Sequence, residues 1–427
     1  MNSQTASGHG YWLTGWLESR RISSARQLRI ALGSESHLTE LRDLAEQWSE
    51  ATSSTSYSGT NLVAGTGLRL DDLLTCPNLP CRRKSVDVLF RHAWHYFDTI
   101  LLPDGVGGLL LDRPDKWDDE FFLNTLLNWI ELVLYIQELG AIELVRYYPK
   151  ARGVACDQPL LAEHSVALEA VIGEVETVLV EKGEFAFQRV DSSSMSAECL
   201  DPLLKVGAHI RIRLPEGRTL GEADLRKAAA HTIVQQHWWY LVEDLAARSR
   251  LGGTLGTEVW SHERIISRLV VPEAQDIAMR IFLPSLSDVP VKELIAIRRS
   301  EGDSFAAFRG ALTKAAKELL AKGGVTDAQR GADTILDDIV LPELARLGQR
   351  LRGAERALAK KAAVSVTLGG LTTTCGLLLG AGPVLAGVAG VTALLSGTAT
   401  AAAKYIEEGQ AVEISDMYFL WKALDHA

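Results

Sequence analysis

The chain has 427 residues, of which 47% are hydrophobic and 23% charged, and its formal net charge is −10 at pH 7. This composition excludes a wholly disordered chain, and the length allows two or three domains with a sizeable core. The acidic balance argues against broad binding to a phosphate backbone, so nucleic acid is not a favoured partner. The cysteines are scattered and odd in number, and no basic segment followed by an apolar run opens the chain, which together indicate a reducing cytoplasm.

Two short amphipathic helices are expected near the start. Ser24 and Gln27 have the spacing of a capping box, before a helix that ends near Gly33. A second helix follows over residues 38–48, where apolar side chains recur at helical spacing. Residues 51–67 are rich in Ser, Thr and Gly, which predicts an irregular segment, either a domain boundary or a mobile lid.

Helices and strands alternate in the next part of the chain. Helical periodicity runs from Ser85 to Phe97, and a turn at Pro103–Gly105 leads to an apolar stretch at Val106–Leu111. Asp118, Asp119 and Glu120 predict the start of a strongly apolar helix that ends at Gly140. Further helices are expected over 163–180 and 222–248, the second followed by a flexible glycine-rich segment at 252–256. Strands are expected over 141–148, 184–190, 206–214, 264–271 and 276–283.

After Pro284 the pattern predicts helices only. Apolar residues recur at spacings of four and three from Val340 to Leu358, a seam like that of a coiled coil, with a kink expected at Pro342. This helix leads directly into the most distinctive stretch of the sequence. Ala362 to Ala403 contains no charged side chain, and Gly382 with Pro383 divides it into two runs. Each run matches the roughly 20 apolar residues that cross a hydrocarbon core, so the sequence predicts a hydrophobic helical hairpin.

Small residues are expected to hold the two helices of the hairpin together. Gly376 and Gly380 form a GxxxG pair, and Ala386 with Gly390 repeats the small-xxx-small spacing, as in a glycine zipper. This spacing allows close helix packing both in lipid and in a dense protein core. Two alternatives therefore remain open: a hairpin that contacts lipid in at least one state, and a hairpin buried in a soluble helical domain. The basic residues over 346–361 are typical of a cytoplasmic membrane flank.

One group of side chains resembles a ligand pocket. Aromatic faces beside titratable groups are expected on the helix at 222–248, where a ligand could be bound. The alternative is that this part of the helix is core, because a buried stripe with helical spacing runs through it at residues 234, 238, 241 and 245. The candidate ligand-binding residues are His237, Trp238, Trp239, Tyr240 and Asp244.

A second candidate is a metal site on the helix before Phe97. His92, His95 and Asp98 follow one another at intervals of three, so the two histidines lie near one face and the carboxylate about one turn further on. No further ligand is identifiable, and the alternative is a packed or half-buried histidine pair. The sequence contains no GxxxxGK[ST], no GxGxxG after a strand, no HExxH and no GxSxG, so no cofactor is expected and no catalytic residue is identified.

These observations predict an α-rich α+β chain with a mixed body at residues 1–285 and an all-helical module at 286–427, which contains the hairpin at 362–403. The first hypothesis is a non-enzymatic, cytoplasmic effector or membrane-associated protein whose hairpin engages a bilayer, an oligomer or a protein partner. The rival is a soluble enzyme or ligand-binding protein in which the hairpin is buried core. Enzymatic activity is left open, with the balance against it.

Overall fold

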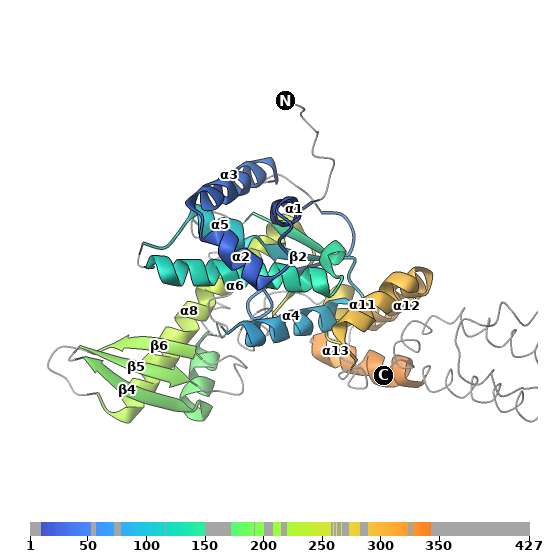
Figure 1. Ribbon diagram of the computed structural model, residues 1–427. Helices are drawn as coiled ribbons and strands as arrows, with labels where there is room; N and C mark the ends of the chain where they lie inside the picture. Colours follow the sequence, from blue (N-terminus) through green and yellow to red (C-terminus); the bar gives the residue numbers. More distant parts are fainter. Residues whose placement is uncertain are drawn as a thin grey trace, which may run out of the picture.

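The structure is a computed structural model, and its arrangement is shown in Figure 1. Helices dominate it, and two small sheets complete an α-rich mixed fold. The described residues are 10–52, 57–71, 78–115, 117–149, 172–191, 193–199, 208–214, 220–257, 259, 262, 266, 273–281, 289–322 and 328–342.

A parallel four-stranded sheet lies at the centre of the body, in the order β3-β2-β1-β7. Its strands are β1 (Asn61–Ala64), β2 (Thr99–Pro103), β3 (Val145–Tyr148) and β7 (Thr254–Gly256). All three pairings are parallel; Leu62 of β1, for example, is in register with Ile100 of β2 and Thr254 of β7. Because the strands are parallel, their carboxyl ends meet at one edge of the sheet. The clusters around Arg69 and Asp104 described below lie at that edge.

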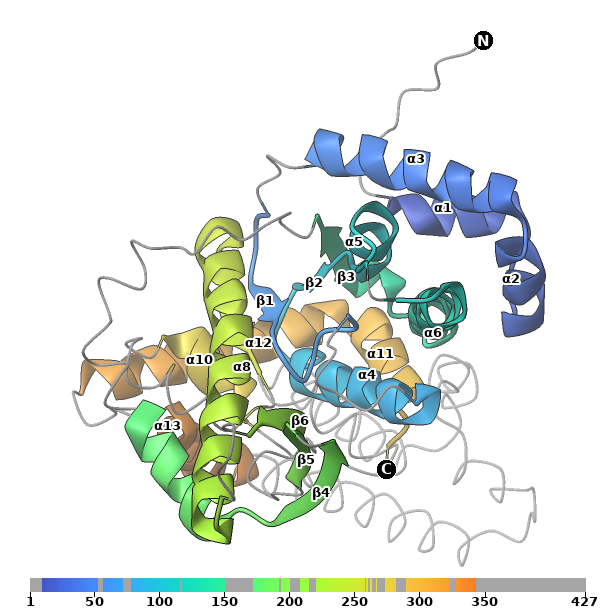
Figure 2. The ribbon, with the colours of Figure 1, turned by 90° about the vertical axis from the view of Figure 1, so that its left-hand side faces the viewer.

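Both faces of this sheet are buried. Leu62 and Tyr147 belong to one hydrophobic core, while Val63 and Tyr148, their neighbours in the chain, belong to a second core on the opposite face. This alternation follows from the period of two in a strand. Figure 2 shows α8 (Glu222–Leu251) on one side of the strands and α5 (Gly105–Leu111) with α6 (Asp119–Glu138) on the other.

The first core is built largely by helices that precede or connect the parallel strands. α2 begins at the expected N-cap, since the Ser24 side chain accepts from the Gln27 N–H, although the Gln27 side chain accepts from the Ser23 N–H rather than from Ser24 as a capping box requires. α6 begins where Asp118 accepts from the Phe121 N–H. The helical segments around this core are α1 (Trp12–Ser19), α2 (Ala25–Leu32), α3 (Glu35–Thr52), α4 (Leu79–Ala93) and the short 3₁₀ turn Ile142–Leu144.

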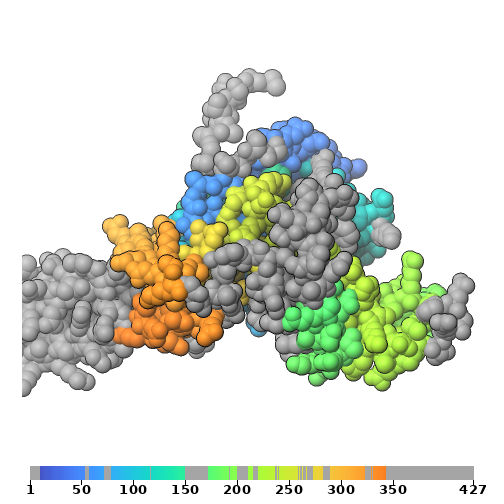
Figure 3. All heavy atoms as spheres, turned by 180° about the vertical axis from the view of Figure 1, so that it is seen from behind, coloured from blue at the N-terminus to red at the C-terminus, as the bar shows by residue number. Residues whose placement is uncertain are grey.

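A three-stranded antiparallel sheet forms a lobe at one end of the molecule. Its strands are β4 (Phe185–Asp191), β5 (Ser194–Cys199) and β6 (Ala208–Arg213), in sequential order. One of its faces packs on α8, with a helical segment at 172–182 completing the second core. In Figure 3 the green atoms of this lobe and the orange atoms of the last described helices gather in separate parts of the surface.

The last described helices pack into the first core. They are α10 (Ala274–Met279), α11 (Val291–Ser300), α12 (Gly302–Ala321) and α13 (Ala328–Ile335), followed by a π-helical turn at Leu336–Val340. Phe305, Phe308 and Leu312 of α12 form the buried stripe that the sequence predicts. None of the described helices combines the length and the hydrophobicity needed to cross a bilayer. The hairpin at 362–403, with Gly376, Gly380, Ala386 and Gly390, lies outside the described residues.

Several sequence expectations are wrong in detail. The strand expected at 276–283 is helical in its first described residues, because the Glu273 side chain and Asp276 form a capping box that starts α10. The segments 51–67 and 252–256, expected to be irregular, contain β1 and β7. β3 occupies only the second half of 141–148, and the apolar stretch at 106–111 belongs to α5. The strand expected at 264–271 lies outside the described residues except for Ile266.

Candidate functional site at the carboxyl edge of the parallel sheet

The loop that follows β1 brings α8 close to the sheet edge. The Gly65 N–H donates to the Gly256 carbonyl at 2.7 Å, which extends the ladder between β1 and β7 by one residue. A Cβ atom on Gly65 would lie 2.8 Å from the Asp244 carboxylate and 2.8 Å from the Gly256 carbonyl. Only glycine leaves room here, so this position permits an acidic side chain of α8 to reach the end of β1.

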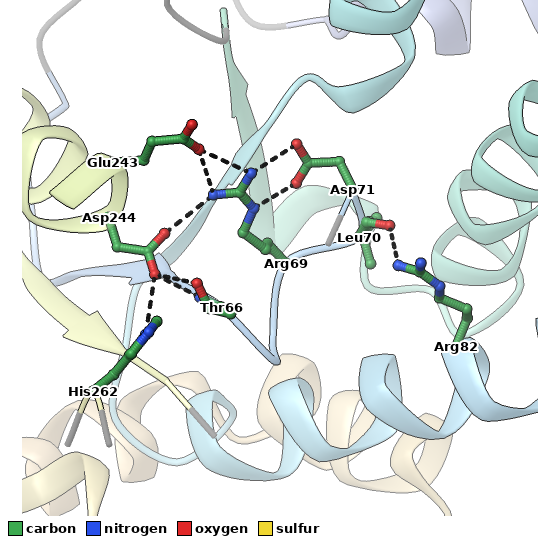
Figure 4. A network of polar contacts seen from close by, with 8 residues as sticks. All are labelled: Thr66, Arg69, Leu70, Asp71, Arg82, Glu243, Asp244 and His262. Carbon is green, nitrogen blue, oxygen red and sulfur yellow. Dashed lines mark hydrogen bonds and ion pairs between the residues drawn. The ribbon is translucent and has the colours of Figure 1, made fainter. Parts of the chain in front are cut away.

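Arg69 is the centre of a buried polar network (Figure 4). Its Nε and Nη2 donate to the two Asp71 oxygens at 2.8 and 3.2 Å, and Nη1 donates to Asp244 at 3.2 Å. Both Nη atoms also contact one Glu243 oxygen at 3.4 Å. Each of the five guanidinium N–H groups thus has a carboxylate acceptor. Burial disfavours the charged arginine, but the attraction of Asp71 and Asp244 outweighs it and raises the pKa of Arg69.

Asp244 connects three elements within this network. Its second oxygen accepts from both the backbone N–H and the hydroxyl of Thr66, each at 2.7 Å. The Thr66 carbonyl in turn accepts from the Thr257 hydroxyl at 2.8 Å, and His262 Nδ1 lies 3.9 Å from Asp244. The loop after β1, the helix α8 and the loop after β7 therefore meet at one carboxylate.

The three carboxylates that contact Arg69 differ in exposure. Side-chain exposure is 1% for Asp71 and 3% for Asp244 but 32% for Glu243. Solvent and solutes therefore reach this network through Glu243.

A second buried carboxylate lies on the opposite face of the same edge. Asp104 follows β2 and caps α5, accepting from the Gly107 N–H at 2.8 Å. It also accepts from the Tyr11 hydroxyl at 2.5 Å and from the Trp12 indole N–H at 2.7 Å. Burial raises the pKa of Asp104, although these donors act in the opposite direction. The two buried groups are neighbours, because Asp71 packs against Gly105, where a Cβ atom would lie 2.3 Å from it.

The structure gathers part of the predicted ligand-binding set at the Arg69 network. Asp244 is a member, and the Tyr240 ring centroid lies 6.0 Å from the Arg69 guanidinium carbon. Trp238 packs partly buried against the second core, whose stripe includes Leu241 and Leu245 as the helical spacing predicts. The side chains of His237 and Trp239 lie outside the described atoms.

The predicted metal residues lie elsewhere and have protein partners. His95 is buried, and its Nε2 lies 3.2 Å from the Ala278 carbonyl. Asp98 accepts from the Thr60 N–H at 3.0 Å and forms an ion pair with Arg309. His92 lies half-buried on α4. Across the ranges that the structure describes, no three His, Cys, Asp or Glu side chains are grouped so that they could hold a metal ion.

Most of the network could not be recognised from the sequence. No pattern marks Thr66, Arg69, Asp71 or Tyr148 as functional residues, because no strand was expected immediately before Thr66, Arg69 and Asp71. The signal that could have found them is the Gly65–Gly67 pair after a short apolar run, together with the Asp104–Gly105 pair after another. Comparison of the chain with protein-family models, with curated proteins and with solved structures gives no match. The site therefore rests on its own geometry.

Proposed function

We propose that the α/β body binds a small ligand at the Arg69 network, and that the protein is a non-enzymatic effector whose C-terminal hairpin engages a bilayer or an oligomer. The observation that carries this proposal is the position of the network: a buried arginine and three carboxylates, contributed by the loop after β1 and by α8, at the carboxyl ends of parallel strands. In open α/β sheets, ligands bind at this edge.

The energetic cost of burying ionic groups indicates that the Arg69 network has a role other than stabilising the fold. Replacement of a buried ion network by packed apolar side chains is often neutral or stabilising, so such a network is weak evidence that stability alone maintains it. One carboxylate, that of Glu243, is also left accessible. Buried ionic groups with shifted pKa values, such as Arg69, cluster at functional sites.

The course of α8 supports communication between the site and the rest of the chain. α8 carries Glu243 and Asp244 at the network, and it packs against β1 and β7 of the parallel sheet. The same helix continues to β6 of the antiparallel lobe. A ligand that changes the position of α8 at the network would therefore act on both sheets.

Ligand binding is tested by thermal denaturation of the full-length chain with a panel of anionic, neutral and cationic metabolites. We expect at least one class to raise the melting temperature, because a ligand that binds only the folded state stabilises it. Glu243→Gln should reduce that rise, while Glu46→Gln, an exposed residue on α3, should leave it unchanged. A panel without any shift, or shifts that Glu243→Gln leaves intact, would overturn the ligand-binding role.

The effector role is tested by co-sedimentation of the full-length chain with liposomes, together with its elution in size exclusion. We expect the full-length chain to bind lipid or to form a defined oligomer. The double variant Leu378→Glu/Leu394→Glu should abolish either behaviour while the body stays folded, because charges within a span oppose insertion. The opposite result is an unaltered chain that is monomeric and does not bind liposomes, together with a double variant that unfolds or precipitates. That result would mean that the hairpin is buried core, and it would support the rival soluble protein.

A further inference from the structure

We propose that the outward face of α2 docks on a membrane surface that carries anionic lipids. This α2 face consists of Arg26, Arg29 and Ile30, and a further arginine, Arg21, precedes it in the turn between α1 and α2. It is separate in the chain from both the Arg69 network and the hairpin. The contact therefore goes beyond the proposed function and is tested independently of it.

The segment around α2 is basic although the chain as a whole is acidic. Residues 20–34 contain four arginines and no Asp or Glu, whereas the formal net charge of the chain is −10. One of the four, Arg20, forms an ion pair with Glu40 at 2.7 Å. The other three are exposed, and within the described part of the chain no ion pair engages them. Three guanidinium groups are therefore available to an anionic surface.

Helical spacing places two of these arginines beside an exposed apolar side chain. Arg26, Arg29 and Ile30 stand at i, i+3 and i+4, so they share one side of the helix. Ile30 is 72% exposed, the highest value for a large hydrophobic residue in the part of the chain that the structure describes. The residues of α2 that are buried in the first core are Leu28, Ala31 and Leu32. The outward face thus combines positive charge with an aliphatic side chain that the core does not use.

A lipid surface fits this combination better than a nucleic acid does. Amphipathic helices that lie on membranes carry basic residues together with apolar side chains, which enter the boundary between headgroups and acyl chains. The phosphates of a nucleic acid would pair with the guanidinium groups but would leave Ile30 in water. Burial of Ile30 therefore distinguishes the lipid surface as the partner.

The position of α2 makes the face accessible to a flat surface. Figure 2 shows α2 at the periphery of the body, where it packs against α3 and α6. A helix at the periphery can meet a membrane without any rearrangement of the core. The structure therefore presents the α2 face ready for contact.

The backbone of Arg21 is a separate indication that charge is needed here. Its φ is 53°, and it is the one described residue other than glycine with a positive φ. It follows the end of α1, where the Ile22 N–H donates to the Leu17 carbonyl at 2.9 Å. Glycine or asparagine is favoured at such a left-handed position after a helix. The local backbone thus does not explain an arginine, whereas contact with an anionic surface does.

The test is hydrogen–deuterium exchange of the full-length chain mixed with lipid vesicles. One set of vesicles contains phosphatidylcholine alone, and the other contains phosphatidylcholine with the anionic phosphatidylglycerol. We expect the anionic vesicles to slow exchange across residues 20–34 and the neutral vesicles to leave it unchanged. The effect should decrease as salt is raised, because the Debye length falls from about 10 Å at 0.1 M to about 3 Å at 1 M.

Two variants separate the charged and the apolar parts of the surface. Arg21→Asn/Arg26→Gln/Arg29→Gln should weaken binding to anionic vesicles about hundredfold, at about fivefold for each arginine. Ile30→Gln should weaken it about tenfold, because it removes the apolar contact. Asparagine suits the left-handed backbone and glutamine suits a helix, so both variants should fold.

Two further variants serve as controls. Lys314→Gln/Lys317→Gln/Lys322→Gln, on and directly after α12, removes the same charge from three exposed lysines and should leave the protection of residues 20–34 unchanged. Leu378→Glu/Leu394→Glu, which tests the hairpin, should also leave it unchanged, because the α2 face binds lipid without the hairpin.

Three results would overturn the docking surface. They are equal protection by neutral and anionic vesicles, protection that the arginine variant retains, and stronger protection of residues 20–34 by duplex DNA than by anionic vesicles. If residues 20–34 are not protected while Leu378→Glu/Leu394→Glu still abolishes lipid binding or oligomer formation, this inference fails and the proposed effector role stands. Protection of residues 20–34 in a chain whose hairpin engages neither lipid nor another copy would mean the reverse.

Discussion

The two buried carboxylate clusters at the carboxyl edge differ in how completely they are satisfied. No described cation pairs with Asp104, and neutral donors from Tyr11, Trp12 and Gly107 surround it at 2.5 to 2.8 Å. The Arg69 network has a buried cation, two buried carboxylates and a third carboxylate, that of Glu243, whose side chain is 32% exposed. The first cluster ties the N-terminal helix to the sheet and has little capacity for a new partner. The second keeps such capacity, which is why we assign ligand binding to it.

The largest expected effect comes from removing the cation of the second cluster. Arg69→Met removes the guanidinium that the buried carboxylates of Asp71 and Asp244 contact, and we expect a loss of about 3 to 5 kcal/mol in the free energy of unfolding. Arg26→Met, an exposed arginine on α2, is the matched control and should change it by less than about 0.5 kcal/mol. Urea denaturation measures both. Similar values for the two variants would show that the network is not a coupled ionic unit.

The next effect is the pH dependence of stability that arises from His95, a buried side chain that is neutral, unlike the charged residues of the Arg69 network. Burial, with smaller contributions from His92 and Arg298, lowers the pKa of His95 from 6.5 to about 4. The unfolded chain therefore binds more protons between these values, and stability should fall as pH decreases from 6.5 to 4, by about 3 kcal/mol in all. His95→Gln should flatten this part of the profile, whereas His231→Gln, on the exposed face of α8, should preserve it.

A smaller effect is expected from the satisfied cluster. Asp104→Asn keeps one acceptor but replaces the other oxygen with an N–H₂ group, so either the Trp12 indole N–H or the Gly107 backbone N–H faces another donor. We expect a loss of about 1 to 3 kcal/mol by thermal denaturation, against no resolvable change for the exposed Asp43→Asn on α3. A neutral Asp104→Asn variant would remove the contrast between the clusters.

The smallest effect is expected at the accessible carboxylate. Glu243→Gln should alter the free energy of unfolding by less than about 1 kcal/mol, because the side chain is 32% exposed and its contacts with Arg69 are long. Asp244→Asn is the comparison within the same network: that carboxylate is 3% exposed and holds Thr66 as well as Arg69, so its loss should be clearly larger. Equal losses would mean that Glu243 is a structural residue rather than a ligand contact.

Local signals in the sequence predict helices better than they predict the parallel sheet. The N-caps at Ser24 and Asp118 are short-range chemistry, and both are confirmed. The alternation at 206–214 predicts β6, since one of its faces packs on α8. β1 and β7 were missed because both are short and buried on both faces, so they show no alternation of apolar and polar residues.

The candidate site could be predicted only in part for a related reason. Asp244 was identified from aromatic residues about one turn away on the same helix, so a short stretch of sequence was enough to find it. Its partner Thr66 lies 178 residues away in the chain, and their contact depends on how α8 packs against β1. No spacing in the sequence encodes that packing. Nor does any local pattern show that Gly65 is the position where a side chain would block it.

The length of α8 has a mechanical consequence. At 30 residues and 1.5 Å per residue, the helix is about 45 Å long, and it has no interruption between Glu222 and Leu251. If the helix behaves as a stiff lever pivoting near Asp244, a rotation of about 5° displaces its distant end by about 3 Å. Sub-ångström adjustments around one carboxylate would thereby become a movement of the antiparallel lobe large enough for distance measurements between attached spectroscopic labels.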